Sequence, residues 1–245
     1  MSFLKLLECK IEIVEFRDIL CTSESFFDST GQQDAHEALI LLLEVLHRST
    51  FSSRIQELGL SQLSQDSSQL STSAVRNTFQ GSFRIVTQCS FCLKSKPSFE
   101  NFQEIEIGLK GDVSRSLSES LLDTITKHCP QCNCDTSHSV TKAIWQQPKI
   151  TILRIQRFKQ MTTGRIHKNT EKLCLKETFS ISGFKASLIG SVSHIGPSTT
   201  SGHYISHVKV VDDWYCCSDE NIKVTKFSTF SDSKECYLLF YIMTA

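Results

Sequence analysis

Cys89-Ser-Phe-Cys92 and Cys129-Pro-Gln-Cys132 are two C-x-x-C pairs separated by 36 residues. Each pair, on a tight turn, can present two thiolates to one metal ion, and two pairs complete a tetrahedral site. Four sulfur ligands favour zinc over hard cations. We therefore expect Cys89, Cys92, Cys129 and Cys132 to hold a zinc ion that ties distant parts of the chain together, so that metal affinity contributes to folding.

Two alternatives to this ligand set remain open. Cys134 and His138 lie near the second pair, and either could replace Cys132 as a ligand. The pairs could also take part in redox chemistry instead of binding a metal. A site of four protein sulfurs has no vacant position for a substrate water, so the expected zinc is structural.

The composition narrows the class of protein. The chain has 245 residues, with 26 basic and 26 acidic side chains and a formal net charge of zero. A balanced charge argues against a nucleic-acid partner, which requires a basic excess. No apolar run approaches the roughly 18 residues of a membrane span, and the N-terminus has no signal-peptide core. We expect a monomer of the cytoplasm or nucleus that makes no membrane contact.

The cysteine count supports the same compartment. Eleven cysteines, an odd number, combined with C-x-x-C spacings and no secretory signal, favour reduced thiols over disulfides. Most cysteines outside the two pairs are expected to be small buried hydrophobic residues. Four of these stand in strand-like contexts, namely Cys174, Cys216, Cys217 and Cys236.

The first half of the chain predicts one long helix followed by a linker. Leucines recur at helical spacing within residues 32–47, and capping side chains precede them. The leucines are Leu39, Leu42, Leu43 and Leu46, and the capping residues are Asp28, Ser29 and Thr30. A Ser/Gln-rich segment over about residues 58–76 has little to bury, so we expect a mobile linker there.

The second half predicts an antiparallel sheet. Alternating or continuous apolar runs begin near Phe83 and recur to the end of the chain. The expected strands cover residues 83–87, 105–109, 150–158, 184–194, 204–211 and 236–242. A short helix is expected over Ser116–Thr126, because Ser116 and Glu119 form a capping box. Helices first and strands later indicate an α+β fold.

A second group of polar residues suggests hydrolytic chemistry. Gly202-His203-Tyr204 opens one predicted strand, and Ser218-Asp219 ends the next, with a turn at residues 212–213 between them. This hairpin can place Ser218 or Asp219 beside the His203 imidazole, fixing its tautomer so that the other nitrogen acts as a base.

Several motifs, read in order from about residue 15 to the end, resemble the ubiquitin-specific protease family of cysteine deubiquitinases. The residues that carry the resemblance are the glutamine–aspartate box from Gln32 to Leu39, Phe79-x-Gly81 before the first C-x-x-C pair, the strand from Gln147-Pro148 to Arg157-Phe158, Gly202-His203-Tyr204, and Tyr237-Leu-Leu-Phe-Tyr241. The resemblance implies one papain-like domain over residues 1–245, with a thumb, a palm and zinc-bearing fingers over about residues 79–145.

The resemblance also implies a function and a set of site residues. It implies thiol-dependent hydrolysis of the isopeptide bond after the C-terminal glycine of ubiquitin, so that the partners are ubiquitin, or a ubiquitin-like modifier, and ubiquitinated proteins. His203 would be the general base. Ser218 stands where the family usually has Asp or Asn and would orient the ring, with Asp219 beside it. Gln33 and Asp34 would help to hold the cleft and the ubiquitin tail.

The family's nucleophilic cysteine box has no recognisable counterpart. Residues 1–30 contain no Gly and no Asn, and neither Cys9 nor Cys21 stands in such a box. Two expectations follow. Either the N-terminal part of the thumb, with the nucleophile, is missing from this chain, or the chain is an inactive member that binds ubiquitin or acts as a scaffold.

Overall fold

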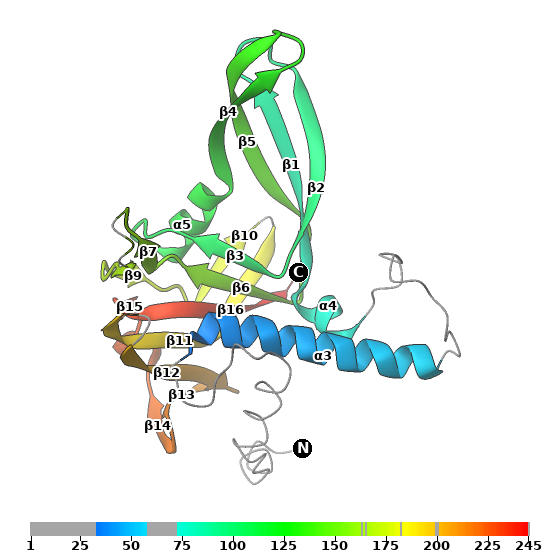
Figure 1. Cartoon of the computed structure of the whole chain (residues 1–245). Helices are drawn as coiled ribbons and strands as arrows, with labels where there is room; N and C mark the ends of the chain where they lie inside the picture. The colour runs from blue at the N-terminus through cyan, green and yellow to red at the C-terminus, as the bar shows by residue number, and fades with distance from the viewer. Residues whose placement is uncertain are drawn as a thin grey trace.

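The computed structural model describes residues 33–57, 73–162, 164, 166–181, 183–198 and 201–244. These residues form a four-stranded sheet, an eight-stranded sheet and two small two-stranded sheets, together with a few helices. In Figure 1 the four-stranded sheet projects away from the larger sheet, and the long helix α3 (Ala35–Glu57) runs across the lower half of the view, below β16 and above β13 and β14. No helix in the described part of the chain is both long and apolar enough to span a membrane.

The projecting sheet contains both C-x-x-C pairs. Its strand order is β2-β1-β5-β4, and all neighbours are antiparallel. The strands are β1 (Gly81–Cys89), β2 (Ser95–Phe102), β4 (Leu122–Cys129) and β5 (Cys134–Gln146). This sheet coincides with the fingers expected from the sequence, and we call it the fingers below. Every residue of β2 except Phe102 is exposed, so the outer part of the fingers has little apolar core of its own.

The larger sheet carries the predicted histidine. Its order is β14-β13-β12-β11-β16-β6-β3, and β10 pairs with β11. Only β3 and β6 are parallel among its described pairs. The strands are β3 (Glu104–Ile107), β6 (Ile150–Ile155), β10 (Thr178–Ile181), β11 (Phe184–Ser198), β12 (Ser201–Val210), β13 (Asp213–Ser218), β14 (Asn221–Thr225) and β16 (Cys236–Thr244).

Strand β6 is buried on both faces, which explains its nearly continuous apolar sequence. On one face, Ile152 packs with Leu43 of α3 and Val75 of α4 (Ala74–Phe79). On the other face, Leu153 and Ile155 join the main core, together with residues of β16 and α5 (Val113–Ser120). Each fully buried aliphatic side chain contributes about 1.5–3 kcal/mol, so this strand anchors the fold.

Helix α3 (Ala35–Glu57) is longer than the predicted helix over residues 32–47. The expected capping residues Asp28, Ser29 and Thr30 lie outside the described residues, and the observed cap is Asp34, whose Oδ1 accepts from the backbone N–H of His36 at 2.7 Å. Leu43 is buried as predicted, but the prediction for Leu46 is wrong, because this side chain is 42% exposed. His47 is buried instead, and its Nδ1 lies 2.6 Å from Oγ of Ser73.

Two further sequence predictions require correction. The predicted linker reaches too far, because Ser73 is buried and caps α4 by accepting from the backbone N–H of Arg76. The helix expected over Ser116–Thr126 is also misplaced. Helix α5 begins earlier, where the Asp112 carboxylate accepts from the backbone N–H of Arg115, and residues 122–129 form strand β4. Oγ of Ser116 accepts a hydrogen bond from the backbone N–H of Lys110 and does not cap a helix. The β-branched residues near Ile125 favour a strand.

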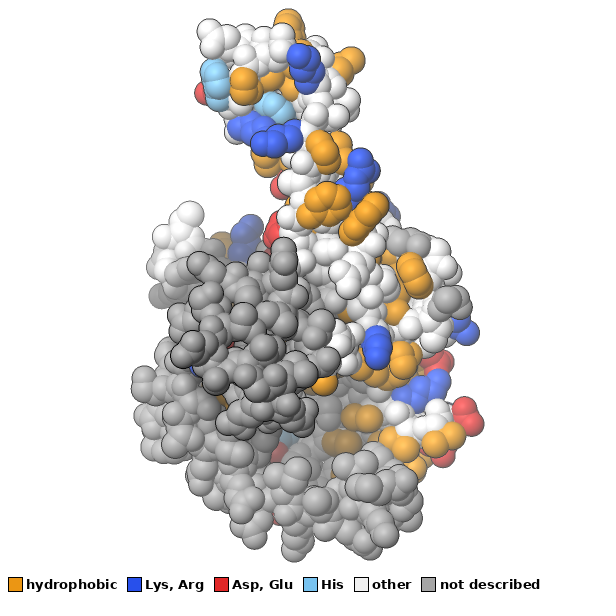
Figure 2. All heavy atoms as spheres, turned by 90° about the vertical axis from the view of Figure 1, so that its right-hand side faces the viewer, with side chains coloured by type: hydrophobic (Ala, Val, Ile, Leu, Met, Phe, Trp, Pro, Cys, Tyr) orange, Lys and Arg blue, Asp and Glu red, His pale blue; other side chains and the backbone are white. Residues whose placement is uncertain are grey.

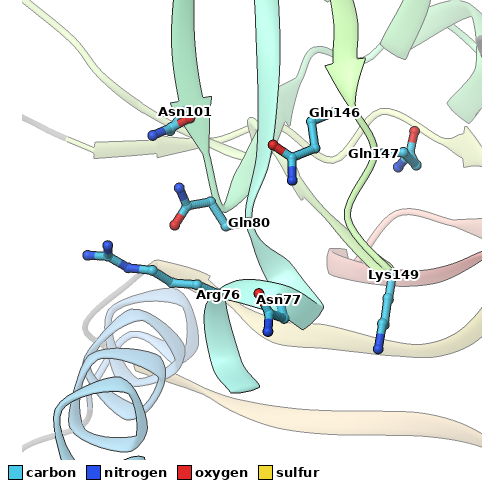
Figure 3. A pocket seen from close by; sticks show the side chains of 7 residues that line it. All are labelled: Arg76, Asn77, Gln80, Asn101, Gln146, Gln147 and Lys149. Atoms are coloured by element: carbon cyan, nitrogen blue, oxygen red, sulfur yellow. The ribbon is translucent and has the colours of Figure 1, made fainter. Parts of the chain in front are cut away.

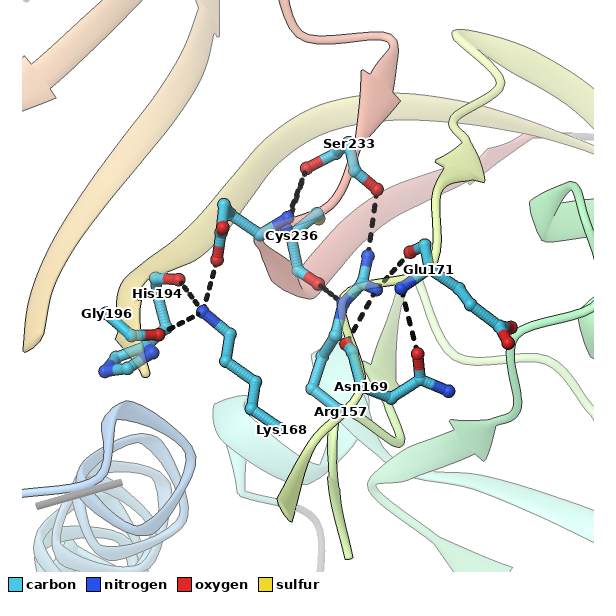
Figure 4. Close-up of polar contacts among 9 residues, drawn as sticks. Arg157, Lys168, Asn169, Glu171, His194, Gly196, Ser233 and Cys236 are labelled. Carbon is cyan, nitrogen blue, oxygen red and sulfur yellow. Dashed lines mark hydrogen bonds and ion pairs between the residues drawn. The ribbon is translucent and has the colours of Figure 1, made fainter. Parts of the chain in front are cut away.

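The remaining elements connect the larger sheet to its surroundings. They are β7 (Phe158–Gln160) paired with β8 (Ile166–Lys168), β9 (Leu173–Cys174) paired with β15 (Asp232–Ser233), and the 3-10 turn η1 (Phe227–Thr229). Arg157, fully buried beside them, donates to backbone carbonyls of Asn169, Glu171, Ser233 and Cys236 (Figure 4). One buried guanidinium therefore joins the segment after β8 to the start of β16.

Candidate functional site

The two C-x-x-C pairs form matching turns at the end of the fingers. The backbone N–H of Leu93 donates to the carbonyl of Cys89 at 3.0 Å, and that of Asn133 donates to Cys129 at 2.8 Å. Both Leu93 and Asn133 have left-handed backbone, with φ of 61° and 52°. The repeated geometry turns both thiols of each pair toward the same point.

The four thiols fit a zinc ion. The sulfur atoms of Cys89, Cys92, Cys129 and Cys132 all lie within 4.8 Å of one another. Sulfurs of opposite pairs approach to 3.9 Å between Cys89 and Cys132 and 3.7 Å between Cys92 and Cys129. These separations match the edges of a tetrahedron with zinc–sulfur bonds of about 2.3 Å. The four cysteines form a structural zinc site.

The pKa values of the cysteine thiols are shifted in opposite directions by their surroundings. The hydrogen bond from the Thr136 hydroxyl and those from the turn backbone lower the pKa of Cys89 to about 5. Burial and the neighbouring sulfurs raise the pKa of Cys132 to about 12. Four thiolates this close repel one another, and a divalent cation removes that repulsion. The two alternative ligands, Cys134 and His138, do not belong to the cluster of four. Cys134 is exposed, and Nδ1 of His138 lies 3.0 Å from the Thr136 carbonyl oxygen.

The histidine of the predicted hydrolytic group lies on β12 beside the end of β13. Nε2 of His203 is 2.8 Å from Oγ of Ser218 and 3.8 Å from a carboxylate oxygen of Asp219. The structure therefore brings all three predicted residues together. Asp219 has left-handed backbone with φ of 51°, which directs the chain out of β13 at this point. Because Nε2 faces Ser218, Nδ1 remains available to act on another group.

Two glycines hold the strands around His203 close together. Strand β11 pairs with β12 through Ile195 and His203, and the regular register ends there with a bulge. Gly196 has φ of +144° and lies against Gly202, where a side chain on either residue would collide with backbone or with the His194 ring. A Cβ on Gly202 would lie 2.2 Å from Nε2 of His194. The close approach fixes the position of the residue that precedes His203.

Asp34 connects the start of α3 to the larger sheet. The hydroxyl of Tyr237 donates to both carboxylate oxygens of Asp34 at 3.1 Å. Burial, together with the nearby Asp34 charge, raises the pKa of Tyr237, so this phenol remains a donor. Gln33 directly precedes Asp34 and is partly buried. Asp34 thus has a structural partner in the described residues, while the role of Gln33 and Asp34 toward a ligand stays a prediction.

A second contact at the start of α3 was not foreseen from the sequence. Nε2 of His36 lies 2.5 Å from the Glu104 carboxylate, which also accepts from Arg154 at 3.0 Å. Arg154 additionally pairs with Glu106. Burial alone would raise the pKa of Glu104, but the hydrogen bonds from His36 and Arg154 outweigh it and lower that pKa. These groups join α3 to β3 and β6.

We expect Glu104→Gln to reduce the acid sensitivity of the fold. A carboxylate whose pKa is lowered in the folded state stabilises the fold at any pH above its unfolded-state pKa of about 4.3. This contribution to stability disappears as the pH falls through the folded-state pKa. The thermal midpoint of the wild-type chain should therefore fall more steeply between about pH 5 and pH 3 than that of Glu104→Gln. Glu220→Gln, at an exposed turn, is the control. If the thermal midpoints of the wild type, Glu104→Gln and Glu220→Gln fell in parallel as the pH was lowered, the role given to Glu104 would be contradicted.

The described residues also line an open polar hollow of about 560 Å³. It lies where α4 and the fingers meet, and Figure 3 shows its side chains. They are Arg76, Asn77, Gln80, Asn101, Gln146, Gln147 and Lys149. None of the predicted site residues lines this hollow.

The side-chain hydrogen bond and the ion pair that His203 makes with described residues involve Ser218 and Asp219 and no cysteine. The described cysteines are the four zinc ligands and Cys134, Cys174, Cys216, Cys217 and Cys236. Cys9 and Cys21, considered in the sequence analysis, lie outside the described residues. The described residues thus provide a candidate base, His203, and its orienting group, Ser218.

A mixed α+β fold with a zinc site at the end of its fingers and a histidine–serine pair on its sheet defines a ubiquitin-specific-protease type of papain-like fold. The chain belongs to the ubiquitin carboxyl-terminal hydrolase family, whose family model, "Ubiquitin carboxyl-terminal hydrolase", matches residues 3–241. The resemblance stated from the motifs is confirmed.

Individual relatives support this membership. The chain is 26% identical over 240 residues to ubiquitin carboxyl-terminal hydrolase 23 of Arabidopsis thaliana, covering 92% of this chain and 27% of the relative. It is 28% identical over 233 residues to ubiquitin carboxyl-terminal hydrolase 17-like protein E of Mus musculus, covering 89% of this chain and 41% of the relative. The chain therefore spans less than half the length of these relatives.

The solved structures agree on the fold. The chain matches the structure titled "SAGA Ubp8/Sgf11/Sus1/Sgf73 DUB module bound to ubiquitin aldehyde" with a TM-score of 0.78 and 20% identity, covering 95% of this chain and 54% of that one. A related structure of the module bound to monoubiquitin gives a TM-score of 0.77, also at 20% identity, covering 95% of this chain and 53% of that one.

Proposed function

We propose that this chain acts in thiol-dependent hydrolysis of the isopeptide bond after the C-terminal glycine of ubiquitin. The observation that carries the proposal is the 2.8 Å contact between Nε2 of His203 and Oγ of Ser218 within a chain of the ubiquitin carboxyl-terminal hydrolase family. This contact orients the imidazole ring through Nε2, so that Nδ1, on the other side of the ring, faces the reacting thiol.

The geometry supports the following roles. Ser218 orients the imidazole, so that Nδ1 takes the proton from a cysteine thiol and the thiolate attacks the carbonyl carbon at the ubiquitin C-terminus. His203 then returns the proton to the leaving lysine amine as the carbon–nitrogen bond breaks. Water, activated by the same ring, hydrolyses the thioester and regenerates the thiol. A carboxylate oxygen of Asp219 lies 3.8 Å from Nε2, so Asp219 is a second polar neighbour of the ring on the same side as Ser218.

Ubiquitin is the partner that we propose. The name of a similar structure states that it is bound to ubiquitin aldehyde, and another to monoubiquitin. In this chain, large apolar side chains are exposed on the fingers, and Figure 2 shows hydrophobic side chains along one side of this projection. The exposed residues of the fingers include Phe91, Leu93, Phe99, Leu122 and Trp145. Exposed apolar surface of this extent supports contact with a partner protein.

Substitutions at the two residues beside His203 test the proposed roles. We expect Ser218→Ala to lower kcat for cleavage of a fluorogenic amide at the ubiquitin C-terminus by roughly 10- to 100-fold, because the ring loses its only close orienting bond among the described residues. Asp219→Ala should lower it by less than about tenfold, since the carboxylate is more distant and largely exposed.

The outcomes of this assay are distinct. Asp219→Ala costing more than Ser218→Ala would reverse the two roles. No cleavage by the folded, zinc-loaded wild-type chain would contradict hydrolysis and favour a non-catalytic ubiquitin-binding role. Zinc content and thermal midpoint, measured on each variant, exclude a folding defect as the cause.

A further inference from the structure

Lys168, at the end of β8, is a buried cation with three acceptors. Its side chain is 2% exposed, and Nζ donates to the backbone carbonyls of His194 at 2.6 Å and Gly196 at 2.8 Å. The third acceptor is the carboxylate of Glu235. Figure 4 shows Nζ beside the carbonyls of His194 and Gly196. Because a lysine ammonium has three protons, this arrangement satisfies all of them.

The two carbonyls flank the residue that faces His203. His194 and Gly196 lie on either side of Ile195, and Ile195 is the β11 partner of His203. The register of β11 and β12 becomes irregular directly after this pair and resumes only at Ser198 and Ser201. Lys168 therefore holds β11 at the last regular pair before the irregular turn.

Glu235, which directly precedes β16, completes the same set of contacts. Its backbone carbonyl accepts from the N–H of His194 at 2.9 Å, while its side chain pairs with Lys168, which donates to the carbonyl of His194. His194 is thus fixed through both its N–H and its carbonyl. The neighbouring Arg157 holds the chain on either side of Glu235, because it donates to the carbonyls of Ser233 and Cys236.

A buried ammonium is an expensive way to fill space. The Lys168 side chain is 2% exposed and the Glu235 side chain 38% exposed, so the cost of losing water falls mainly on Lys168, and an apolar residue of similar volume would avoid that cost. A methionine at position 168 could fill the same volume, but it could not donate to the carbonyls of His194 and Gly196. The contacts that only a cationic donor makes here are those that define the backbone opposite His203.

We propose that Lys168 and Glu235 are positioning residues for His203, acting through the β11 backbone rather than by contact with substrate. They hold Ile195, and with it the β12 residue His203, in register for its contact with Ser218. The proposal rests on the proposed function for its catalytic consequence, but its structural part is measurable in the chain without any substrate.

Amide hydrogen exchange measured by NMR on the zinc-loaded chain tests the structural part. In Lys168→Met we expect the amides of His194, His203 and Tyr204 to exchange at least about tenfold faster, because hydrogen bonds to a buried charge are lost. The matched control is Lys209→Met, which removes a lysine from the same strand as His203 and its 2.6 Å pair with Glu177. The proposal would be overturned if Lys209→Met accelerated exchange of the same three amides, or if Lys168→Met left their exchange rates unchanged.

Glu235→Gln keeps the test decisive if Lys168→Met does not fold, because it retains an acceptor oxygen and loses only the charge. It should show the same three amides accelerated, by a smaller factor, and unchanged exchange would again overturn the proposal.

Kinetics test the catalytic consequence. Both variants should lower kcat for the ubiquitin amide, Lys168→Met by about tenfold or more, with KM changed less than about threefold. A loss confined to KM would contradict positioning. Absence of turnover in the wild-type chain would count against the proposed function, while the exchange comparison would still decide whether Lys168 fixes His203.

Discussion

Cys129→Ser is expected to release the zinc ion and unfold the outer part of the fingers. Cys129 is a buried member of the four-sulfur cluster, and β2 and β4 around it expose almost every residue. With so little apolar core, the end of the fingers depends on the metal, whose binding contributes roughly 10–16 kcal/mol in small zinc domains. A loss of even about 4 kcal/mol would lower the thermal midpoint by roughly 10 °C for a chain of this size.

Metal analysis and thermal unfolding measured on the same samples check this result. The wild-type chain should contain one zinc per chain and Cys129→Ser none. Cys134→Ser is the matched control, because Cys134 is an exposed cysteine that follows the same turn and lies outside the cluster. Equal zinc content and equal midpoints in the wild type and Cys129→Ser would refute the zinc assignment.

The second large effect is expected at His203. His203→Ala should reduce hydrolysis of a ubiquitin C-terminal amide by at least about 10⁴-fold, because no other described group holds a base nitrogen beside Ser218. The ring is 42% exposed, so its removal creates no internal cavity and should leave the thermal midpoint and zinc content close to wild type.

His128→Ala serves as the comparison for this variant. His128 is an exposed histidine of the fingers, 58% exposed at its side chain. Its loss should leave hydrolysis within about threefold of wild type, as for surface residues away from the reacting groups. Retained activity in His203→Ala would remove His203 from the proposed mechanism.

The parts of the fold that the sequence predicted well are those determined by local pattern. The apolar run of β6 indicated a strand because burial on both faces requires apolar residues in succession, and the C-x-x-C spacing indicated a metal site because each turn can aim two sulfurs at one point. The sequence also predicted that Ser218 or Asp219 lies beside His203, because the hairpin brings the start of β12 close to the end of β13, and the contact itself forms beyond the last paired residues, Ser206 and Cys217.

The parts that were missed depend on partners far away in the sequence. Leucine periodicity placed Leu46 in the core, whereas His47 is buried because Ser73, beyond the linker, offers it a hydrogen bond. Lys168 stands in a polar stretch that reads as a surface loop, and its acceptors are mostly backbone carbonyls, which leave no trace in the sequence. The contact of Asp34 with Tyr237 likewise joins residues at opposite ends of the chain.

A labelling reaction with ubiquitin that carries a thiol-reactive group in place of its C-terminal carboxylate would show whether His203 activates a thiol of this chain toward ubiquitin. The folded, zinc-loaded wild-type chain is predicted to form a covalent adduct with one ubiquitin, and peptide mapping would identify the cysteine that reacts. The adduct should be lost in His203→Ala. If the wild-type chain forms no adduct, or if His203→Ala forms it at the wild-type rate, the account of His203 as the base for a ubiquitin-directed thiol is contradicted.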